Sequence, residues 1–255
     1  MLVLKVISRL LDYPSQAVSD HSGELLVVVN ESSLSVANKN QLTAFITELA
    51  GADLYDAQER YDLLFERGRS LSLLLFEHVH GESRDRGQAM VDLMKEYNEH
   101  GFDVNSEQLP DYIPLYLEFL SEQSEDYIHE WLSGVVHILS VLSERLLDRE
   151  CDYRILFESL IELSGADTST ERAQIAKAVK KEQRDDTIAA IDKAWEDKEI
   201  RFDDPIQSGA ECGGGYSTPL PESVPTSDSP APSLAQELAP EIPITWHTAS
   251  GTPAA

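Results

Sequence analysis

The sequence holds few cysteines and no long apolar run. Cys151 and Cys212 are the two cysteines among 255 residues, which is too few for a disulfide framework or a four-ligand zinc site. No stretch approaches the roughly 20 apolar residues that a membrane-spanning helix requires. The segment Met1–Tyr13 is apolar but lacks the basic leader and the small-residue cleavage site of a signal peptide. These absences predict a cytoplasmic protein that does not insert into membranes.

Basic residues are also scarce. The 20 lysines and arginines are outnumbered by 46 aspartates and glutamates, so the formal net charge is −26. Such a surface repels the phosphates of nucleic acids and the head groups of anionic lipids, and it attracts basic peptides. The composition therefore argues against nucleic acid as a partner and favours a cationic polypeptide. A second interpretation is that the acidity only keeps the protein soluble.

Proline is nearly absent from the first 200 residues and abundant after them. Nine of the 12 prolines lie between residues 205 and 253, mixed with Gly, Ser, Thr and Ala. A segment of this composition buries too little apolar surface to offset its ordering entropy. We therefore expect a folded domain over 1–202 and a disordered tail over 203–255. The tail could also serve as a tether or a partner-docking arm, because three large apolar residues lie near its end: Ile242, Ile244 and Trp246.

The apolar residues before the tail recur with the spacing of helices. One stripe with this spacing consists of Val3, Val6, Ile7, Leu10 and Leu11. The longest predicted helix runs from Glu125 to about Arg149, and Thr168 with Glu171 indicates a capping box for a later helix. Sustained alternation with a period of two is absent. The pattern predicts a single all-α domain.

The stretch from Arg60 to Gln88 has a different charge balance from the rest of the chain. Five arginines offset five acidic residues there, so the stretch is neutral within a strongly acidic protein. Three glycines and four of these arginines surround the apolar run Leu71–Phe76, which predicts a long ordered loop between helices. The simplest alternative is a buried connector whose arginines pair with nearby acids.

Histidines in the same stretch raise the question of a metal site. His78 and His80 could converge on a metal only in an irregular loop, because residues two apart point away from one another on strands and on helices. Glu77 and Glu82 could complete such a site. The chain lacks a Gly-x-Gly-x-x-Gly motif, a phosphate loop and a Gly-x-Ser-x-Gly elbow. We therefore expect no catalytic residue and no metal site.

The segment Leu109–Leu120 is also informative. Its two prolines predict a helix start, and Asp111 could either cap the first turn of that helix or face an arginine of a partner. Tyr112, Tyr116 and Phe119 share one helix face. That face either packs in the core or lines an aromatic groove with a carboxylate rim, which would suit a peptide that carries arginine and apolar residues.

Several motifs together resemble a known family. The stretch Leu73–Met90 is closely similar to the signature of the assembly chaperone, or delta subunit, of respiratory nitrate reductase. This family is related to the chaperones of dimethyl-sulfoxide and trimethylamine-oxide reductases. Further matches are Ser8–Pro14, Leu64–Arg69, Leu109–Leu120 and Arg184–Thr187. The resemblance spans most of residues 1–200, and the tail lies outside it.

The resemblance implies an all-helical, system-specific chaperone without an active site. Its partner would be the apo catalytic (alpha) subunit of respiratory nitrate reductase, contacted at its N-terminal peptide and at a second surface. The chaperone would hold this subunit in the cytoplasm until the molybdenum cofactor is inserted and the membrane-bound complex assembles. It would bind no cofactor stably and would not be part of the finished enzyme. Cofactor-delivery proteins are further candidate partners.

The two informative segments and their surroundings supply the expected partner-binding residues. These are Tyr61, Phe65, Arg69, Phe76, Glu77, His78, His80, Arg84, Arg86, Asp111, Tyr112, Pro114, Tyr116 and Glu118. The wider family often has Asp-His where this chain has Asp111 and Tyr112, so no role that requires an imidazole is carried over. Two other functions stay open: a small helical enzyme or metal-binding protein that uses His78 and His80, and a generic helical adaptor without a preferred partner.

Overall fold

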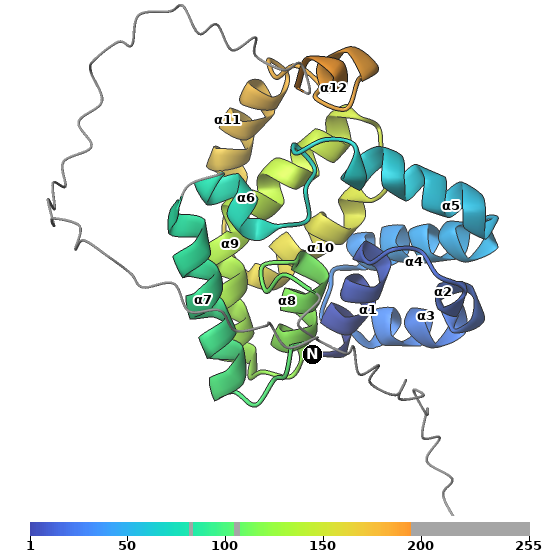
Figure 1. Ribbon diagram of the computed structural model, residues 1–255. Coiled ribbons are helices and arrows are strands. Elements are labelled where there is room, and N and C mark those ends of the chain that lie inside the picture. The colour runs from blue at the N-terminus through green and yellow to red at the C-terminus, as the bar shows by residue number, and fades with distance from the viewer. Residues whose placement is uncertain (82–83, 105–107, 195–255) are drawn as a thin grey trace, which may run out of the picture. The chain divides into compact units, whose positions relative to one another are not determined.

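The computed structural model describes residues 1–81, 84–104 and 108–194. Within them the chain forms helices and no strand, so the predicted all-α fold is confirmed (Figure 1). The elements are α1 (Leu2–Leu11), α2 (Gln16–Asp20), α3 (Ser22–Glu31), α4 (Val36–Gly51), α5 (Leu54–Tyr61), a π-helical turn η1 (Asp62–Glu66), α6 (Leu75–His80), α7 (Arg84–Glu99), α8 (Ile113–Ser121), α9 (Glu125–Asp148), α10 (Arg154–Ser164), α11 (Ser169–Val179) and α12 (Ile188–Ala194).

The longest of these helices, α9, organises the core. It packs against α10 and α11, while α8 packs against α1 (Figure 1). The side chains of Ile128, Leu132, Leu142 and Leu146 are fully buried along one stripe of α9, which is the spacing that amphipathic helices use to face a core. Its predicted start at Glu125 is confirmed, and its end lies one residue before the predicted one.

The first helix joins the core through both apolar and polar contacts. Its apolar stripe is buried, as the spacing predicts. Ser8 is also buried, and its hydroxyl donates a hydrogen bond of 2.7 Å to the carbonyl oxygen of Pro114. This bond satisfies a hydroxyl that would otherwise be buried without a partner, and it fixes α1 against the start of α8.

The long loop predicted around the apolar run Leu71–Phe76 is wrong in its extent. The loop covers 67–74; residues Leu75–His80 form α6, and α7 begins at Arg84. A helix of six residues is too short for its apolar spacing to be distinguished from that of a loop. It ends at Gly81, whose φ of 54° lies in a region that favours glycine.

Local residues define the ends of several helices. Asp53 caps α5, because its side chain accepts a hydrogen bond of 2.9 Å from the N–H of Tyr55. Helix α10 ends at Gly165, which has a φ of 67°. The capping box at Thr168 is wrong: α11 begins at Ser169, but the Thr168 side chain makes no capping hydrogen bond.

Two further predictions concern the remainder of the chain and the membrane. The tail 203–255 and the domain boundary at residue 202 lie outside the described residues, and both stay predictions. In the part of the chain that the structure covers, no helix has both the length and the apolar character needed to cross a bilayer.

Candidate partner-binding site

An isolated antiparallel bridge joins the stretch Arg60–Gln88 to the segment Leu109–Leu120. It pairs Leu74 with Tyr112. The N–H of Leu75 donates to the carbonyl oxygen of Asp111 at 2.9 Å, and the N–H of Ile113 donates to that of Leu73 at 2.8 Å. The start of α6 is therefore fixed beside the start of α8, although 38 positions separate the bridged residues in the sequence.

A cavity of about 480 Å³ lies between α6, α7, α8 and α9. Its lining is mainly apolar and consists of Leu75, Phe76, Leu93, Tyr116, Glu130, Trp131, Gly134 and Val135. The carboxylate of Glu130 is the acidic group in this lining. Clefts of this size and character take large apolar groups whose ends carry a few polar atoms. Of the residues predicted to bind a partner, Phe76 and Tyr116 line the cavity.

The wall contributed by α9 was not recognised in the sequence. Trp131 and Val135 are half-buried there, and Gly134 between them has no atom within 4 Å of the position that a Cβ would take. Glycine in a helix interior costs about 1 kcal/mol relative to alanine. The sequence feature that could have indicated this wall is Gly134, because a glycine in the middle of a long helix and near Trp131 and Val135 leaves space beside the helix.

Tyr116 belongs to both the core and the cavity wall. Its side chain is 3% exposed, and its hydroxyl donates a hydrogen bond of 3.0 Å to the carbonyl oxygen of Trp131. The Trp131 ring stacks on Tyr127, with centroids 5.2 Å apart. Phe119 is fully buried. The core interpretation of this aromatic face is therefore confirmed for Phe119, while Tyr116 is buried and also lines the cavity, so the peptide-groove interpretation stays a prediction for it.

Asp111 lies in the interior behind α6. It is 0% exposed, and its Oδ2 accepts a hydrogen bond of 3.1 Å from the N–H of Phe76 and lies 3.7 Å from the Arg86 guanidinium. Burial raises the pKa of this carboxyl, although the Phe76 hydrogen bond and Arg86 oppose the shift. The prediction that Asp111 caps the helix that follows it is wrong, because the carboxylate caps α6 instead. A direct bond to a partner arginine would require Asp111 to leave this site.

Glu77 and His78 of α6 both contact Ser72, whereas His80 lies beside Phe76. The Ser72 hydroxyl donates to Glu77, and Nε2 of His78 lies 2.8 Å from the Ser72 carbonyl oxygen and donates to it. Burial lowers the pKa of His78, so its ring is neutral near pH 7. The ring of His80 lies 5.9 Å from that of Phe76. No three metal-ligating side chains cluster anywhere in the described ranges.

The other predicted partner-binding residues do not line the cavity. Tyr61 and Phe65 are buried, and the Tyr61 hydroxyl donates to the Leu11 carbonyl oxygen at 2.9 Å. The Tyr112 hydroxyl donates to Asp12 at 3.1 Å. Arg69 pairs with Glu77 at 3.9 Å, and Glu118 pairs with Arg9 at 3.8 Å. Pro114 is buried at the first turn of α8. The side chain of Arg84 lies outside the described part of the structure.

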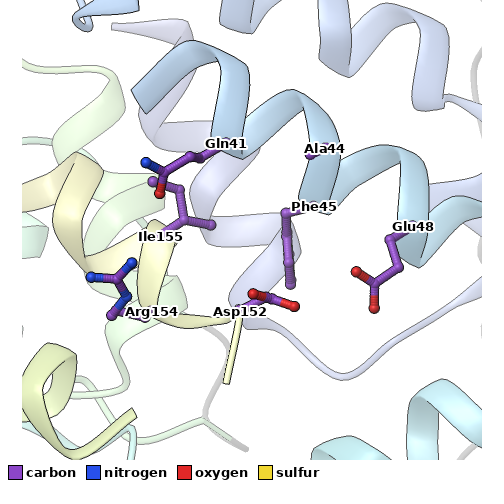
Figure 2. Close-up of a pocket in the computed structure, with 7 residues that line it drawn as sticks. All are labelled: Gln41, Ala44, Phe45, Glu48, Asp152, Arg154 and Ile155. Atoms are coloured by element: carbon purple, nitrogen blue, oxygen red, sulfur yellow. The ribbon is translucent and has the colours of Figure 1, made fainter. Parts of the chain in front are cut away.

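A second hollow, of about 190 Å³, lies between α4 and the start of α10 (Figure 2). It is lined by Gln41, Ala44, Phe45, Glu48, Asp152, Arg154 and Ile155. Four of these side chains are polar or charged. This hollow is smaller than the cavity between α6 and α9 and offers less apolar surface to a peptide.

Comparison with known proteins assigns the family. The family model described as nitrate reductase delta subunit matches residues 31–154. The chain is 44% identical over 203 residues to the nitrate reductase molybdenum cofactor assembly chaperone NarJ of Escherichia coli K12, covering 79% of this chain and 85% of that protein. It is 44% identical over 204 residues to the probable chaperone NarW of the same organism, covering 79% and 84%.

A more distant relative supports the same assignment. A probable NarJ of Bacillus subtilis is 31% identical over 90 residues, which are 34% of this chain and 49% of that protein. The matches with the Escherichia coli proteins span most of both chains, so the similarity is not confined to one motif. The chain belongs to the nitrate reductase delta subunit family of molybdenum cofactor assembly chaperones.

Proposed function

We propose that this protein is an assembly chaperone for a respiratory nitrate reductase. It binds the apo catalytic subunit, permits insertion of the molybdenum cofactor and assembly of the membrane-bound complex, and is absent from the finished enzyme. The observation that carries the proposal is the 44% identity with a nitrate reductase chaperone over 85% of its length. The protein acts in the cytoplasm, catalyses no reaction of its own and binds no cofactor stably.

The cavity between α6 and α9 is the proposed site for the N-terminal peptide of the catalytic subunit. Its volume of about 480 Å³ accommodates one or two large apolar side chains. Trp131 and Tyr116 offer ring surface, and Glu130 offers a carboxylate to a basic group of the peptide. The net charge of −26 adds a long-range attraction for a cationic segment.

Asp111 influences this site through Phe76. Its carboxylate holds the N–H of Phe76, and the Phe76 side chain forms part of the cavity wall. Moving Asp111 would therefore move the wall rather than remove a direct contact. Predicted residues outside the cavity, among them Arg69 and Glu118, are candidates for the second surface that contacts the catalytic subunit.

Filling the cavity tests this assignment. Gly134→Leu places an apolar side chain in the open space above Gly134. We expect the affinity for a synthetic N-terminal peptide of the catalytic subunit to fall at least about tenfold, or about 1.4 kcal/mol, in isothermal titration. The melting temperature should stay level or rise, because leucine favours a helix over glycine by close to 1 kcal/mol.

The matched control is Gly23→Leu in α3. Gly23 is exposed and also has no atom within 4 Å of a Cβ position, but it does not line the cavity. This variant should bind the peptide as the wild type does. Unchanged peptide affinity in Gly134→Leu would remove the cavity from the proposal.

A cellular experiment tests the broader function. Cells that lack this protein should accumulate the catalytic subunit without molybdenum cofactor, measured as the molybdenum content of the purified subunit. The wild-type gene should restore that content. Full cofactor loading without the protein would instead favour a generic adaptor.

A further inference from the structure

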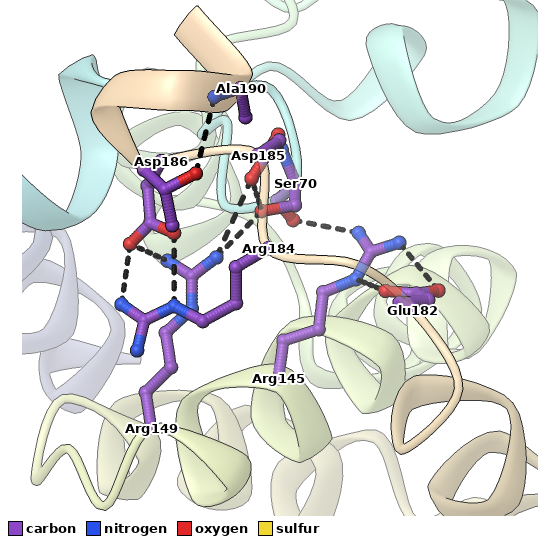
Figure 3. A network of polar contacts seen from close by, with 9 residues as sticks. Ser70, Arg145, Arg149, Glu182, Arg184, Asp185, Asp186 and Ala190 are labelled. Carbon is purple, nitrogen blue, oxygen red and sulfur yellow. Dashed lines mark hydrogen bonds and ion pairs between the residues drawn. The ribbon is translucent and has the colours of Figure 1, made fainter.

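The segment after α11 is attached to the domain through polar contacts. The residues 180–193 are exposed or half-buried, and the contacts of residues 182–186 described below are polar. Glu182 forms a two-bond pair with Arg145 at 2.8 and 3.0 Å. Asp185 and Asp186 lie near Arg149, the residue that follows α9 (Figure 3). The Glu182 side chain is 41% exposed, so salt and solvent compete for its pair with Arg145, whereas Arg149 and Asp186 are largely shielded from them.

The carboxylate of Asp185 occupies a set of converging hydrogen-bond donors. Its Oδ2 accepts from the N–H of Ser70 at 2.7 Å, and its Oδ1 accepts from the Ser70 hydroxyl at 2.5 Å. A Cβ at Gly68 would lie 2.7 Å from Oδ1, so this approach requires glycine at that position. Burial acts to raise the pKa of Asp185, but the Ser70 bonds outweigh it and lower the pKa. The loop therefore binds a negative charge.

The carboxylates of the segment fill this site incompletely. The Arg149 side chain is 7% exposed, and its Nη1 has no hydrogen-bond partner. The acids nearest to its two Nη atoms, Asp185 and Asp186, lie 3.6 Å away, beyond hydrogen-bond distance. A buried guanidinium nitrogen without an acceptor is unusual. A larger anion with more oxygen atoms could satisfy it.

A second arginine borders the same loop. Nη1 of Arg145 donates to the carbonyl oxygen of Ser70 at 2.7 Å, and its other nitrogens bind Glu182. If residues 182–186 moved away, the Ser70 donors, Arg145 and Arg149 would be left together. This set of a backbone N–H, a hydroxyl and two guanidinium groups is the donor chemistry that recognises phosphate.

We propose that Ser70, Arg145 and Arg149 form an anion site for a small phosphate-bearing molecule, and that Asp185 occupies the site until such a ligand displaces it. A phosphate group supplies three oxygen atoms where the carboxylate supplies two, so it can reach Arg149 while keeping the Ser70 bonds. The acidic chain opposes anion binding at long range, but exposed charges beyond about 8 Å are screened at physiological salt. The inference is independent of the proposed chaperone function.

Removing the internal competitor tests the site. Asp185→Ala should bind inorganic pyrophosphate at least tenfold more tightly than Asp56→Ala, as measured by isothermal titration. Asp56 is exposed on α5, so its replacement changes the net charge equally without touching the site. Adding Arg149→Gln to Asp185→Ala should abolish the gain. Equal affinities of the two single variants would overturn the proposal.

The same titration with ADP separates two sources of the phosphate. Tighter binding of ADP than of pyrophosphate by Asp185→Ala would support a nucleotide as the ligand. Equal binding would support recognition of the diphosphate alone. Binding of neither, in a variant that melts normally, would count against the site.

Unmodified protein provides a second measurement. Pyrophosphate should accelerate hydrogen exchange in residues 180–194, because displacement of Asp185 releases the segment. Sodium chloride at the same ionic strength should do so less, because chloride cannot bridge Ser70 and Arg149. Equal acceleration by both salts would show simple screening of the Asp185 contacts and would overturn the proposal even if Asp185→Ala proves unstable.

Discussion

The half-buried Glu158 and the buried Asp111 differ in how closely their arginines approach them. Glu158 of α10 accepts hydrogen bonds of 2.8 and 2.5 Å from Arg172 and one of 2.7 Å from Ser143. Burial alone would raise its pKa, but these bonds lower it. The ionised form of Glu158 is therefore favoured in the folded protein, and its network ties α10 and α11 to α9.

Asp111 is more completely buried and less well bonded. It accepts one hydrogen bond from Phe76, its Oδ1 has no partner, and Arg86 stays 3.7 Å away. The Nε of Arg86 also lacks a partner. Here burial dominates, and the pKa is raised.

The difference between Glu158 and Asp111 shows that the distance to the arginine decides how much a carboxylate removed from water contributes to stability. A pair with short bonds offsets its desolvation, whereas a separated pair does not. The well-bonded network lies among packed helices, and the poorly bonded pair lies beside the cavity wall. The pair with fewer hydrogen bonds thus lies beside the proposed peptide site.

The largest expected effect comes from Arg172. Arg172→Gln leaves Glu158 and Glu144, both mostly buried, without their shared cation. We expect the free energy of unfolding to fall by about 2–4 kcal/mol at pH 7, measured by urea denaturation. Arg154→Gln is the control, because Arg154 lies 3.8 Å from Glu158 and is more exposed. Equal losses in the two variants would show that bond geometry is unimportant here.

The pH dependence of this effect has a definite sign. The folded pKa of Glu158 lies below its ordinary value of 4.5, so its contribution is present above about pH 4.5 and is lost as the pH falls through the folded pKa. The advantage of the wild type over Arg172→Gln should therefore shrink as the pH is lowered from 7 to 3. An advantage that grows in acid would contradict the assignment.

Replacing Asp111 should change the free energy of unfolding less than replacing Arg172, and the change should depend on pH in the opposite direction. Asp111→Asn keeps an acceptor for the Phe76 N–H and should change the free energy of unfolding by less than about 1 kcal/mol at pH 7. Asp111→Ala removes the acceptor and should cost about 1–2 kcal/mol. The difference between the two variants, measured by urea denaturation, isolates the capping bond.

Acid provides the contrast with Glu158. The folded pKa of Asp111 is raised above 3.8, so the ionised carboxylate carries a penalty that is relieved as the pH falls through that pKa. Relative to Asp111→Asn, the wild type should gain stability on acidification. A loss in acid would mean that Arg86 outweighs burial.

The smallest effect is expected from the tail. Glu158 and Asp111 both belong to the domain predicted over residues 1–202. We expect this domain to fold without residues 203–255. Truncation after residue 202 should leave the melting temperature unchanged, as followed by circular dichroism. A lower melting temperature would show that the tail contributes to the stability of the domain.

Helix positions followed from the sequence where the apolar pattern was long. The stripe from Ile128 to Leu146 predicted α9 to within one residue, because each turn repeats the same information. Helix α6 was missed because it has six residues and its cap is Asp111, 35 positions from Phe76. No local pattern reports an acceptor that arrives from such a distance.

The candidate site was predicted in part for the same reason. Phe76 and Tyr116 were recognised because they lie in motifs, and they do line the cavity. Leu93 and Gly134 were missed, because their role depends on how α7 and α9 pack and not on their neighbours in the sequence. Asp111 was recognised as important, but its orientation could not be read from a helix-start pattern.

The bridge between Leu74 and Tyr112 makes residues 75–111 a loop whose two ends lie side by side. Backbone hydrogen bonds join its two ends. The entropy that is lost when the ends of such a loop meet grows only slowly with the length of the loop. Helix α7, which carries Leu93 of the cavity wall, lies inside this segment. Leu75 and Tyr97 of this segment are nevertheless buried in the core, where the Tyr97 ring packs on Phe119 of α8. The wall that α7 contributes to the cavity is therefore tied to α8 at two points, by the bridge at the ends of the segment and by Tyr97 within it.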